Sequence, residues 1–502
     1  MSNSEAPYER FTAAARELAD LGHAESLLHW DQETCMPRRG SGPRARSLGT
    51  LAGLVHERLT APDLVELVES LDGEGLSGDA RVNVRELKRH QDRALRIPRE
   101  LVVELTRTES LAHEAWVEAR EKSEFVLFQP WLEKIVDLKR QEAHAVGFTG
   151  SVYNALLDHF EPHARVEEIE PLLGELRRRL VPLVEEILGS EAAAQREDLL
   201  EREYDVALQE SFGRRVLADL GFDMEAGRLD VSVHPFCSGS HPGDVRLTTR
   251  YAAGQLTSAL FGIIHEAGHG LYEQGLPAEA EGLPVGGSVS LGIHESQSRT
   301  WENAVGRSRE FWEHYLPHLA ECFPAQLEGV GVDRFYAFVN RVERSLIRVE
   351  ADEMTYDLHI LLRFELEKAL IEGELDVGDL PGVWNERMDS YLGIRPGSDA
   401  EGVLQDIHWS MGLIGYFPTY TLGNLYGAQF HRRACADLGD LPGQIRRGEF
   451  SGLLGWMREN IHSRGSRLTA SELVQEVTGE PLRVDYLMEY LEGKYRPLYG
   501  LD

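Results

Sequence analysis

Long hydrophobic runs are missing from this sequence of 502 residues. The longest apolar stretches, such as residues 260–264, are far shorter than the roughly 20 residues of a membrane-spanning helix, which excludes a transmembrane protein. The N-terminus has neither the basic nor the apolar region of a secretory signal. Four widely spaced cysteines form no C-x-x-C pair and no disulfide framework. These absences predict a cytoplasmic protein with reduced thiols.

Positive charge is also scarce. Lys and Arg together number 52 against 84 Asp and Glu, which gives a net charge of −32. Such a surface repels phosphate backbones and anionic lipid headgroups, so the sequence predicts no nucleic-acid partner and no membrane partner. Only six of the cationic residues are Lys. A GC-rich genome explains this skew, while adaptation to salt explains both the skew and the acidity, and both explanations stay open.

Apolar residues recurring at intervals of three and four predict a mostly α-helical protein. The predicted helices cover residues 8–29, 85–125, 165–190 and 335–372, the last one ending before Gly373. Residues 71–80 predict a surface loop and not a domain linker. Since neither a repeat nor a linker divides the chain, we expect residues 1–502 to form a single catalytic domain.

Strand-like alternation is confined to the middle of the chain. Residues 229–234 and 245–249 are the predicted strands, and the Gly/Ser/Pro-rich segment 237–243 is predicted to join them as a hairpin or sharp loop. The expected fold class is therefore mostly α, a single large helical body with a small β element just before the helix described next.

The sharpest motif is His265-Glu266-Ala267-Gly268-His269. It lies in a predicted helix over residues 255–274, and residues four apart lie one above the other on a helix, so both imidazoles can bind one cation. Glu266 lies beside this pair, where a carboxylate can act as general base on metal-activated water.

A catalytic zinc needs a third protein ligand. Glu295 follows His269 by 26 residues, which leaves room for the chain to turn back and present a carboxylate from a second helix. Residues 294–297 are predicted to open this helix, which continues over residues 298–316. The metzincin pattern is excluded because its third histidine is missing. His294 is the alternative ligand, but adjacent helical residues point about 100° apart, and a Glu ligand also lowers the charge of a two-His site.

At this point the chain resembles the thermostable (Taq-type) H-E-x-x-H metallocarboxypeptidases almost from end to end. The resembling motifs are His29-Trp30-Asp31-Gln32-Glu33-Thr34 with Met36-Pro37, His234-Pro235-Phe236, Asp244-x-Arg246-x-Thr248, His265 to His269, His294-Glu295-Ser296-Gln297, Ile347-Arg348-x-x-Ala351-Asp352 and Gly402-x-x-Gln405-Asp406-x-His408-Trp409. The resemblance implies a saddle-like helical fold with a deep active-site groove, and a homodimer. It also implies one zinc or cobalt ion per subunit and the release of single C-terminal amino acids from peptides with broad specificity.

Two further tasks of such an enzyme need residues. Stabilising the oxyanion needs a donor besides the metal, for which His408, with Asp406 nearby, and Tyr420 are the candidates. Binding the free C-terminal carboxylate suits the planar fork of Arg, and Arg348 and Arg246 compete for this role.

Each of these arginines also has a purely structural interpretation. Arg348 lies four residues before Asp352 in a predicted helix and would pair with it, and Arg246 would pair with Asp244. His234 is grouped with the substrate-binding candidates through its motif. Trp30 and Asp31 are expected to pack, because no step of the chemistry needs them.

Two other functions remain open on the sequence. One is a helical zinc oligopeptidase or dipeptidyl carboxypeptidase with an open groove. The other is a non-catalytic, metal-containing scaffold that binds peptides. Glu266 argues against the scaffold, because a structural metal site needs no base beside its ligands.

Overall fold

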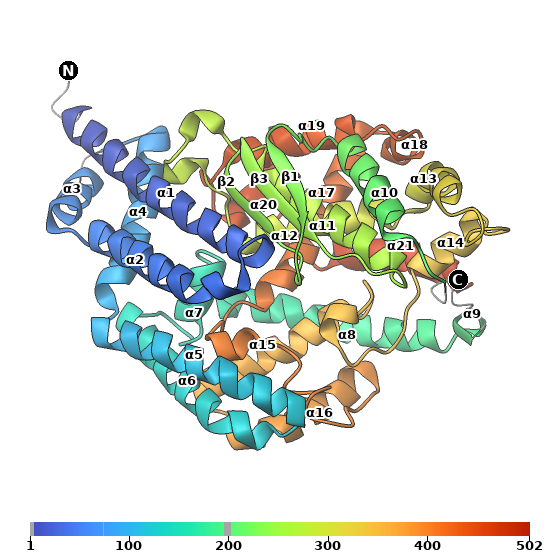
Figure 1. The fold of residues 1–502 in the computed structure, drawn as a ribbon, viewed down its shortest axis with the longest axis horizontal. Coiled ribbons are helices and arrows are strands. Elements are labelled where there is room, and N and C mark those ends of the chain that lie inside the picture. The colour runs from blue at the N-terminus through green and yellow to red at the C-terminus, as the bar shows by residue number, and fades with distance from the viewer. Residues whose placement is uncertain (1–4, 74, 195–201, 502) are drawn as a thin grey trace.

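The computed structural model describes residues 5–73, 75–194 and 202–501. Helices make up most of this part of the chain, and a three-stranded sheet lies near its middle (Figure 1). This arrangement confirms the predicted mostly α fold with a small β element. None of the described helices combines the length and the apolar character that crossing a membrane demands.

The helices before the sheet agree with the predicted pattern in most places. They are α1 (Glu5–Thr34), α2 (Ser41–Leu59), α3 (Pro62–Asp72), α4 (Gly78–Arg96), α5 (Arg99–Lys122), α6 (Phe125–Val146), α7 (Asn154–Phe160), α8 (Val166–Leu188), α9 (Glu191–Ala194) and α10 (Val206–Asp219). The predicted helix over residues 85–125 is wrong as one element, because Pro98 forces Ile97 out of the helical conformation and so separates α4 from α5. The predicted loop at 71–80 joins α3 to α4, and its residue 74 lies outside the described residues.

The sheet differs from the predicted hairpin. Its strands are β1 (Gly227–Val231), β2 (Cys237–His241) and β3 (Asp244–Thr249), in the order β1-β3-β2. The segment expected to be a connection is itself strand β2, which pairs antiparallel with β3, while β1 pairs parallel with β3. The hairpin prediction for residues 229–234 and 245–249 is therefore wrong, although both segments contain strands.

The second half of the chain is again helical. Its helices are α11 (Leu256–Glu273), α12 (Leu291–Arg299), the π-helical segment η4 (Thr300–Gly306), α13 (Arg309–Cys322), α14 (Val332–Val339), α15 (Tyr356–Glu372), α16 (Leu380–Leu392), α17 (Pro418–Leu438), α18 (Leu441–Arg446), α19 (Ser451–Asn460), α20 (Ala470–Thr478) and α21 (Asp485–Leu498). α11 matches its predicted range closely. The helix predicted over residues 298–316 is wrong, because α12 begins earlier and η4 separates it from α13.

The long helix predicted over residues 335–372 is also wrong. The chain forms α14, a short 3₁₀ turn (Arg348–Glu350) and then α15, which ends at Gly373 with a positive φ of 79° as expected. Asp352 accepts hydrogen bonds from the backbone N–H groups of Glu343, Met354 and Thr355. These side-chain bonds compete with the helical ladder and explain the break.

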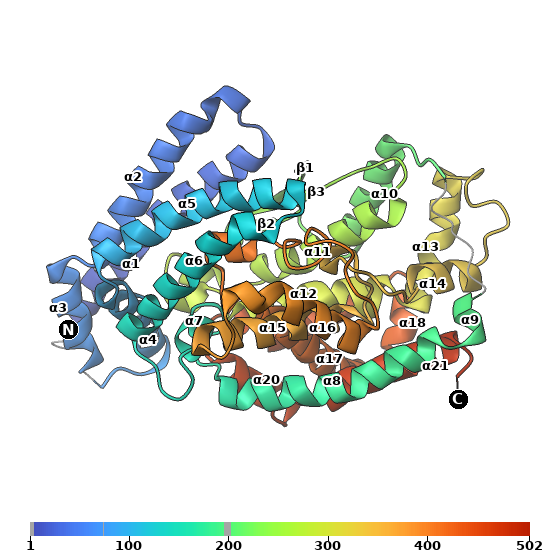
Figure 2. The same ribbon diagram turned by 90° about the horizontal axis from the view of Figure 1, so that it is seen from below.

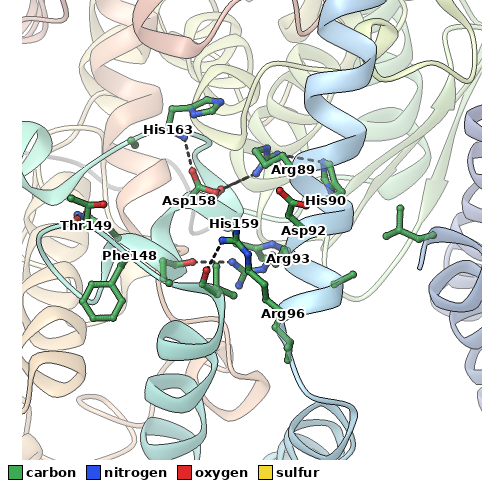
Figure 3. A pocket seen from close by; sticks show the side chains of 18 of the residues that line it. Arg89, His90, Asp92, Arg93, Arg96, Phe148, Thr149, Asp158, His159 and His163 are labelled. Atoms are coloured by element: carbon green, nitrogen blue, oxygen red, sulfur yellow. Dashed lines mark hydrogen bonds and ion pairs between the residues drawn. The ribbon is translucent and has the colours of Figure 1, made fainter. Parts of the chain in front are cut away.

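One large core cluster runs from Ala112 to Tyr499 and a smaller one joins α1, α3 and α4. α11 packs on β3 and α12, and α12 packs on α17, so the segment with the H-E-x-x-H motif lies inside the main core. Viewed from below, α1 and α2 form a hairpin at one end of the molecule, while α12, α15 and α17 lie near its centre (Figure 2). A separate cavity of about 660 Å³ is lined by α4, α7 and the segment that follows α6 (Figure 3).

Close approach of α11 and α12 depends on Gly268. A Cβ atom at this position would lie 2.5 Å from Ser298 Cα and 2.7 Å from Gln297 O, both in the backbone of α12. Backbone cannot move aside as a flexible side chain can, so α12 would have to shift. Gly262 on the same helix has only Thr249 Oγ1 within 4 Å, at 3.7 Å from the added Cβ.

We expect Gly268→Ala to lower the free energy of unfolding by about 1–3 kcal/mol through this overpacking. Gly262→Ala is the matched control and should be neutral or stabilise by up to about 1 kcal/mol, because Ala has the higher helix propensity. Urea unfolding of the two variants measures both values. If the Gly268→Ala and Gly262→Ala variants are equally stable, the close contact between the backbones of α11 and α12 does not limit substitution at residue 268.

Candidate metal centre

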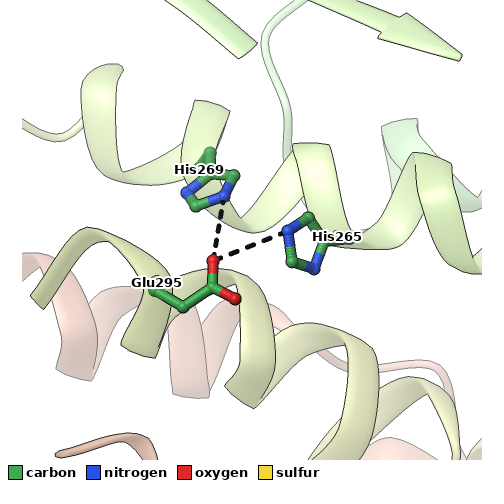
Figure 4. Close-up of side chains that lie close together, drawn as sticks. All are labelled: His265, His269 and Glu295. Atoms are coloured by element: carbon green, nitrogen blue, oxygen red, sulfur yellow. Dashed lines mark ion pairs between the residues drawn. The ribbon is translucent and has the colours of Figure 1, made fainter. Parts of the chain in front are cut away.

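Three side chains from two helices meet in the core. His265 and His269 lie one turn apart on α11, and Glu295 projects toward them from α12 (Figure 4). The Glu295 Oε2 atom lies 3.6 Å from His265 Nε2 and 3.4 Å from His269 Nε2. Their ligand atoms all lie within 4.8 Å of one another. The sequence-predicted set of two imidazoles and one carboxylate is thus brought together, with both histidine side chains still reachable by solvent.

Glu295 is almost completely buried and is held by its own helix. Arg299 Nε donates to its Oε1 at 2.7 Å, and Ser298 Oγ donates to its Oε2 at 2.9 Å. Burial by itself would raise the pKa of Glu295, but Arg299 and the two imidazoles hold that pKa well below its ordinary value. The carboxylate is therefore ionised and ready to bind a cation.

His265 is oriented by a carboxylate that the sequence analysis missed. Its Nδ1 lies 2.9 Å from Glu302 Oε2, which leaves Nε2 to face Glu295. Glu302 comes from the π-helical segment and also contacts Arg299 and Arg307. Such an outer carboxylate fixes the tautomer and the ring orientation of a metal-binding histidine. Its spacing of seven residues from Glu295 was the available signal, since residues i and i+7 share a helix face.

His269 is oriented differently, through a second histidine. Its Nδ1 lies 2.6 Å from His294 Nδ1, and His294 Nε2 lies 2.7 Å from Glu273 Oε1. Both ring nitrogens of His294 are thus occupied by partners behind His269. The alternative in which His294 replaces Glu295 as ligand finds no support in this geometry.

Glu266 lies next to this group and is 6% exposed. Burial is the largest influence on its ionisation and raises the pKa of Glu266 to about 7. A carboxyl group with a pKa near the working pH can both accept and return a proton.

His408 and Tyr420 lie together in a second cluster. Their ring centroids are 6.5 Å apart, and Phe417 stacks near His408 at 4.5 Å. Burial is the main cause that lowers the pKa of His408 to about 4, with Arg348 adding to it, so the imidazole is neutral near pH 7. Burial also raises the pKa of Tyr420 well above its ordinary value. Both groups can therefore donate a proton in a hydrogen bond.

Arg348 belongs to the same cluster and is 6% exposed. Its Nε and Nη2 donate to Asp406 Oδ1 at 3.0 and 2.8 Å, and Nη1 donates to the Tyr356 hydroxyl at 3.2 Å. The predicted structural pairing of Arg348 with Asp352 is therefore wrong, because the helix that would have aligned them is interrupted. Arg363, fully buried, also binds Asp406, through Oδ2.

Arg246 lies on β3 and forms the pair expected of it. Its Nε and Nη2 donate to the two oxygens of Asp244 at 2.8 and 2.9 Å. Its guanidinium also lies 4.4 Å from the ring centroid of Trp30, which agrees with the packing expected of that residue. His234 is exposed in the connection between β1 and β2, where its carbonyl accepts from Ser232.

Known proteins that resemble this chain identify its family. The model of the family described as Carboxypeptidase Taq (M32) metallopeptidase matches residues 10–495. The chain belongs to this M32 family. It is a metallocarboxypeptidase, and the resemblance inferred from the motifs is confirmed.

Relatives of this M32 chain match it over nearly their whole length. Thermostable carboxypeptidase 1 of Thermus thermophilus is 47% identical and covers 99% of both chains. Carboxypeptidase 1 of Bacillus subtilis is 38% identical, covering 98% of this chain and 99% of the relative. The crystal structure of the M32 carboxypeptidase from Deinococcus radiodurans R1 superimposes with a TM-score of 0.96 at 41% identity, covering 99% of this chain and all of that one.

The family implies a metal cofactor, and the residues present fit one. Two imidazole nitrogens and a carboxylate oxygen converge within binding range of a single ion, and this donor set is that of catalytic zinc sites that keep one position open. The outer partners Glu302 and His294 orient each imidazole from behind, as metal ligation requires.

We expect Glu302→Gln to weaken metal binding about 10–100-fold, because the amide cannot hold the His265 tautomer as a carboxylate does. Competition with a chromophoric chelator measures this affinity. Glu328→Gln, the same change at an exposed position, is the control and should leave metal affinity unchanged. Wild-type affinity in the Glu302 variant would mean that Glu302 serves only to neutralise Arg299 and Arg307.

Proposed function

We propose that this M32 protein is a zinc-dependent carboxypeptidase that releases single C-terminal amino acids from peptides with broad specificity. The observation that carries the proposal is the convergence of His265, His269 and Glu295 beside the buried carboxyl group of Glu266. His265, His269 and Glu295 would hold one zinc ion, with cobalt as an alternative. When bound, the metal would polarise the scissile carbonyl and increase the acidity of water.

The residues of the chain would then divide the proton transfers and the charge stabilisation. Glu266 accepts the proton of the attacking water and returns it to the nitrogen of the leaving amino acid. This double role suits its raised pKa of about 7. His408 and Tyr420 donate hydrogen bonds to the developing oxyanion. His234, exposed after β1, contacts the substrate at the rim of the groove that we propose.

Arg348 is our candidate for binding the terminal carboxylate, and charge counting supports it over Arg246. Arg348 and Arg363 share the single carboxylate of Asp406, so this buried trio keeps one positive charge. A buried charge without a counterion is costly, and a substrate carboxylate would neutralise it. Arg246 is already matched one to one by Asp244.

We further propose that residues 1–502 act as one catalytic domain, that the protein is a homodimer, and that it works in the cytoplasm. Support for one domain comes from the main core cluster, which extends from α5 to the C-terminal segment. The homodimer follows from the motif resemblance alone.

The function is tested with a blocked dipeptide and a blocked tetrapeptide, together with metal analysis of the purified protein. We expect one equivalent of zinc and stepwise release of single amino acids from both substrates. Release of dipeptides or internal cleavage would instead identify an oligopeptidase or a dipeptidyl carboxypeptidase. Metal binding without any hydrolysis would indicate a peptide-binding scaffold.

Replacing Glu266 by Gln should leave the metal bound and lower kcat by at least roughly 10²–10⁴-fold, because the amide keeps the shape and loses the base. Glu279→Gln, at an exposed position, is the control and should retain full activity. The measurement is kcat with metal content determined on the same sample. Near-normal activity in a zinc-replete Glu266→Gln variant would rule out Glu266 as the base.

The carboxylate assignment predicts how the enzyme distinguishes free-acid from amidated peptides. Arg348→Ala should reduce this discrimination roughly 30-fold or more, since truncating one partner of a buried charged pair costs about 2–5 kcal/mol. Arg348→Lys should also be impaired, because a point charge cannot form two parallel hydrogen bonds. The ratio of kcat/KM for acid and amide substrates is measured for Arg348→Ala and Arg246→Ala in parallel. A ratio that falls only in the Arg246 variant would assign the carboxylate to β3.

A further inference from the structure

The cavity of about 660 Å³ beside α4 stands out by its charge. Four arginines line it against two aspartates, and its lining contains no glutamate, although the whole chain carries −32. Arg89 and Arg93 project from α4 toward α7, Arg96 reaches the end of α6, and Arg165 follows α7 in the chain (Figure 3). The other polar lining residues are four histidines, Thr149 and Asn154; the histidines are His56, His90, His159 and His163.

Carboxylates beside the cavity pair with two of its four guanidiniums, Glu142 with Arg93 and Glu86 with Arg89. Asp92 pairs with Lys88 at 3.1 Å, on its own helix. Asp158 accepts from the backbone N–H of His163 at 2.8 Å and lies 3.4 Å from Arg89. The positive charge left in the cavity is therefore that of Arg96 and Arg165.

Arg96 and Arg165 hold the least-compensated charges of the cavity. Arg96 donates to the carbonyl of Val146 at 2.8 Å, and Arg165 donates to the carbonyl of Thr149 at 3.0 Å. Arg165 also lies 3.6 Å from the exposed carboxylate of Glu167. A guanidinium has five N–H donors, so these bonds leave most of the donors of both residues for a ligand.

Burial lowers the pKa of two histidines of the cavity. Removal from water and the nearby Arg93 and Lys139 lower the pKa of His159 to about 4. Removal from water and the nearby Arg89 lower the pKa of His90 as well. The charged groups facing these rings are Arg89, Arg93 and Glu86 on α4, Lys139 and Glu142 on α6, and Asp158 on α7. The three cations and three carboxylates among them balance, so removal from water is the main cause of both lowered pKa values.

From this geometry we propose that the cavity between α4 and α7 is a binding site for a small multivalent oxyanion of the phosphate or polycarboxylate class. Its volume suits a metabolite-sized ligand. Arg matches the oxygens of phosphate and carboxylate groups by forked hydrogen bonds. Leu59, Ile97, Val102 and Phe148 supply an apolar wall, which favours a ligand with an apolar part beside its charged group.

Calorimetric titration of the metal-loaded protein tests the site, with pyrophosphate and citrate as probes. Wild type should bind at least one of them saturably. Tighter binding of pyrophosphate indicates a phosphate ligand, and tighter binding of citrate indicates a polycarboxylate ligand. Arg96→Gln and Arg165→Gln should each weaken binding about tenfold, since each removes charge-assisted hydrogen bonds. Arg107→Gln, at an exposed residue of α5 whose nearest carboxylate is Glu104 at 4.0 Å, is the control and should bind as wild type does.

Two results would overturn the proposal. One is the lack of saturable binding of either probe at millimolar concentration. The other is binding that Arg96→Gln and Arg165→Gln leave unchanged, which would place the probe elsewhere, for example on the active-site metal. Because both variants lie outside the proposed catalytic residues, their peptide hydrolysis without added anion should equal that of wild type. This result also shows that they fold.

Binding should also be coupled to proton uptake. An oxyanion beside His159 raises the pKa of this imidazole, so titrations near pH 5 should absorb a fraction of a proton per ligand. Titrations in buffers of different ionisation enthalpy measure this uptake. It should disappear in His159→Gln while much of the affinity remains, and the same uptake in that variant would contradict the placement of the anion next to His159.

Discussion

The neutralisation of a buried carboxylate, Glu295, is the constraint on which the centre of the molecule depends. A carboxylate removed from water is stable only when cations and hydrogen-bond donors replace its hydration shell. Here Arg299, Ser298 and the two imidazoles of α11 provide that shell. For these groups to reach one another, α11 and α12 must touch backbone to backbone, which the missing side chain of Gly268 allows. The close packing of α11 on α12 and the neutralisation of Glu295 therefore depend on the same contact between the two helices.

The imidazoles of His265 and His269 have different hydrogen-bond partners, because different elements lie behind them. Glu302 of the π-helical segment contacts His265 directly, and two arginines compensate its charge. His269 instead has His294 behind it, with Glu273 of its own helix as the terminal acceptor. A carboxylate hydrogen-bonded to a histidine raises the basicity of that ring. The pKa of His265 is accordingly raised by Glu295 and Glu302 against the effect of burial, whereas burial lowers the pKa of His269 to about 3.

The sequence could predict those parts of the site that depend on local geometry. Two histidines four residues apart share a helix face whatever the rest of the fold does, and the turn back to Glu295 needed only sufficient chain length. The sequence could not predict contacts between residues that lie far apart in the chain. Glu302 contacts His265 from 37 residues away, and Asp406 pairs with Arg348 from 58 residues away, where the expected partner was Asp352. The sheet prediction was wrong for the same reason, since β1 pairs directly with β3 although β2 lies between them in the chain.

The trio of Arg348, Arg363 and Asp406, which we propose as the site of carboxylate recognition, shows how such a site can be stable and still carry an uncompensated charge. A single buried Arg would be too costly, and an Arg matched by its own carboxylate would have little to gain from a second one. Two guanidiniums on one carboxylate meet both requirements, because each has a counterion and the group still carries one positive charge. The neighbouring imidazole of His408 adds no charge near neutral pH, since its pKa is about 4. An incoming carboxylate therefore completes the electrostatic balance of the cluster, and an amide, which carries no charge, does not.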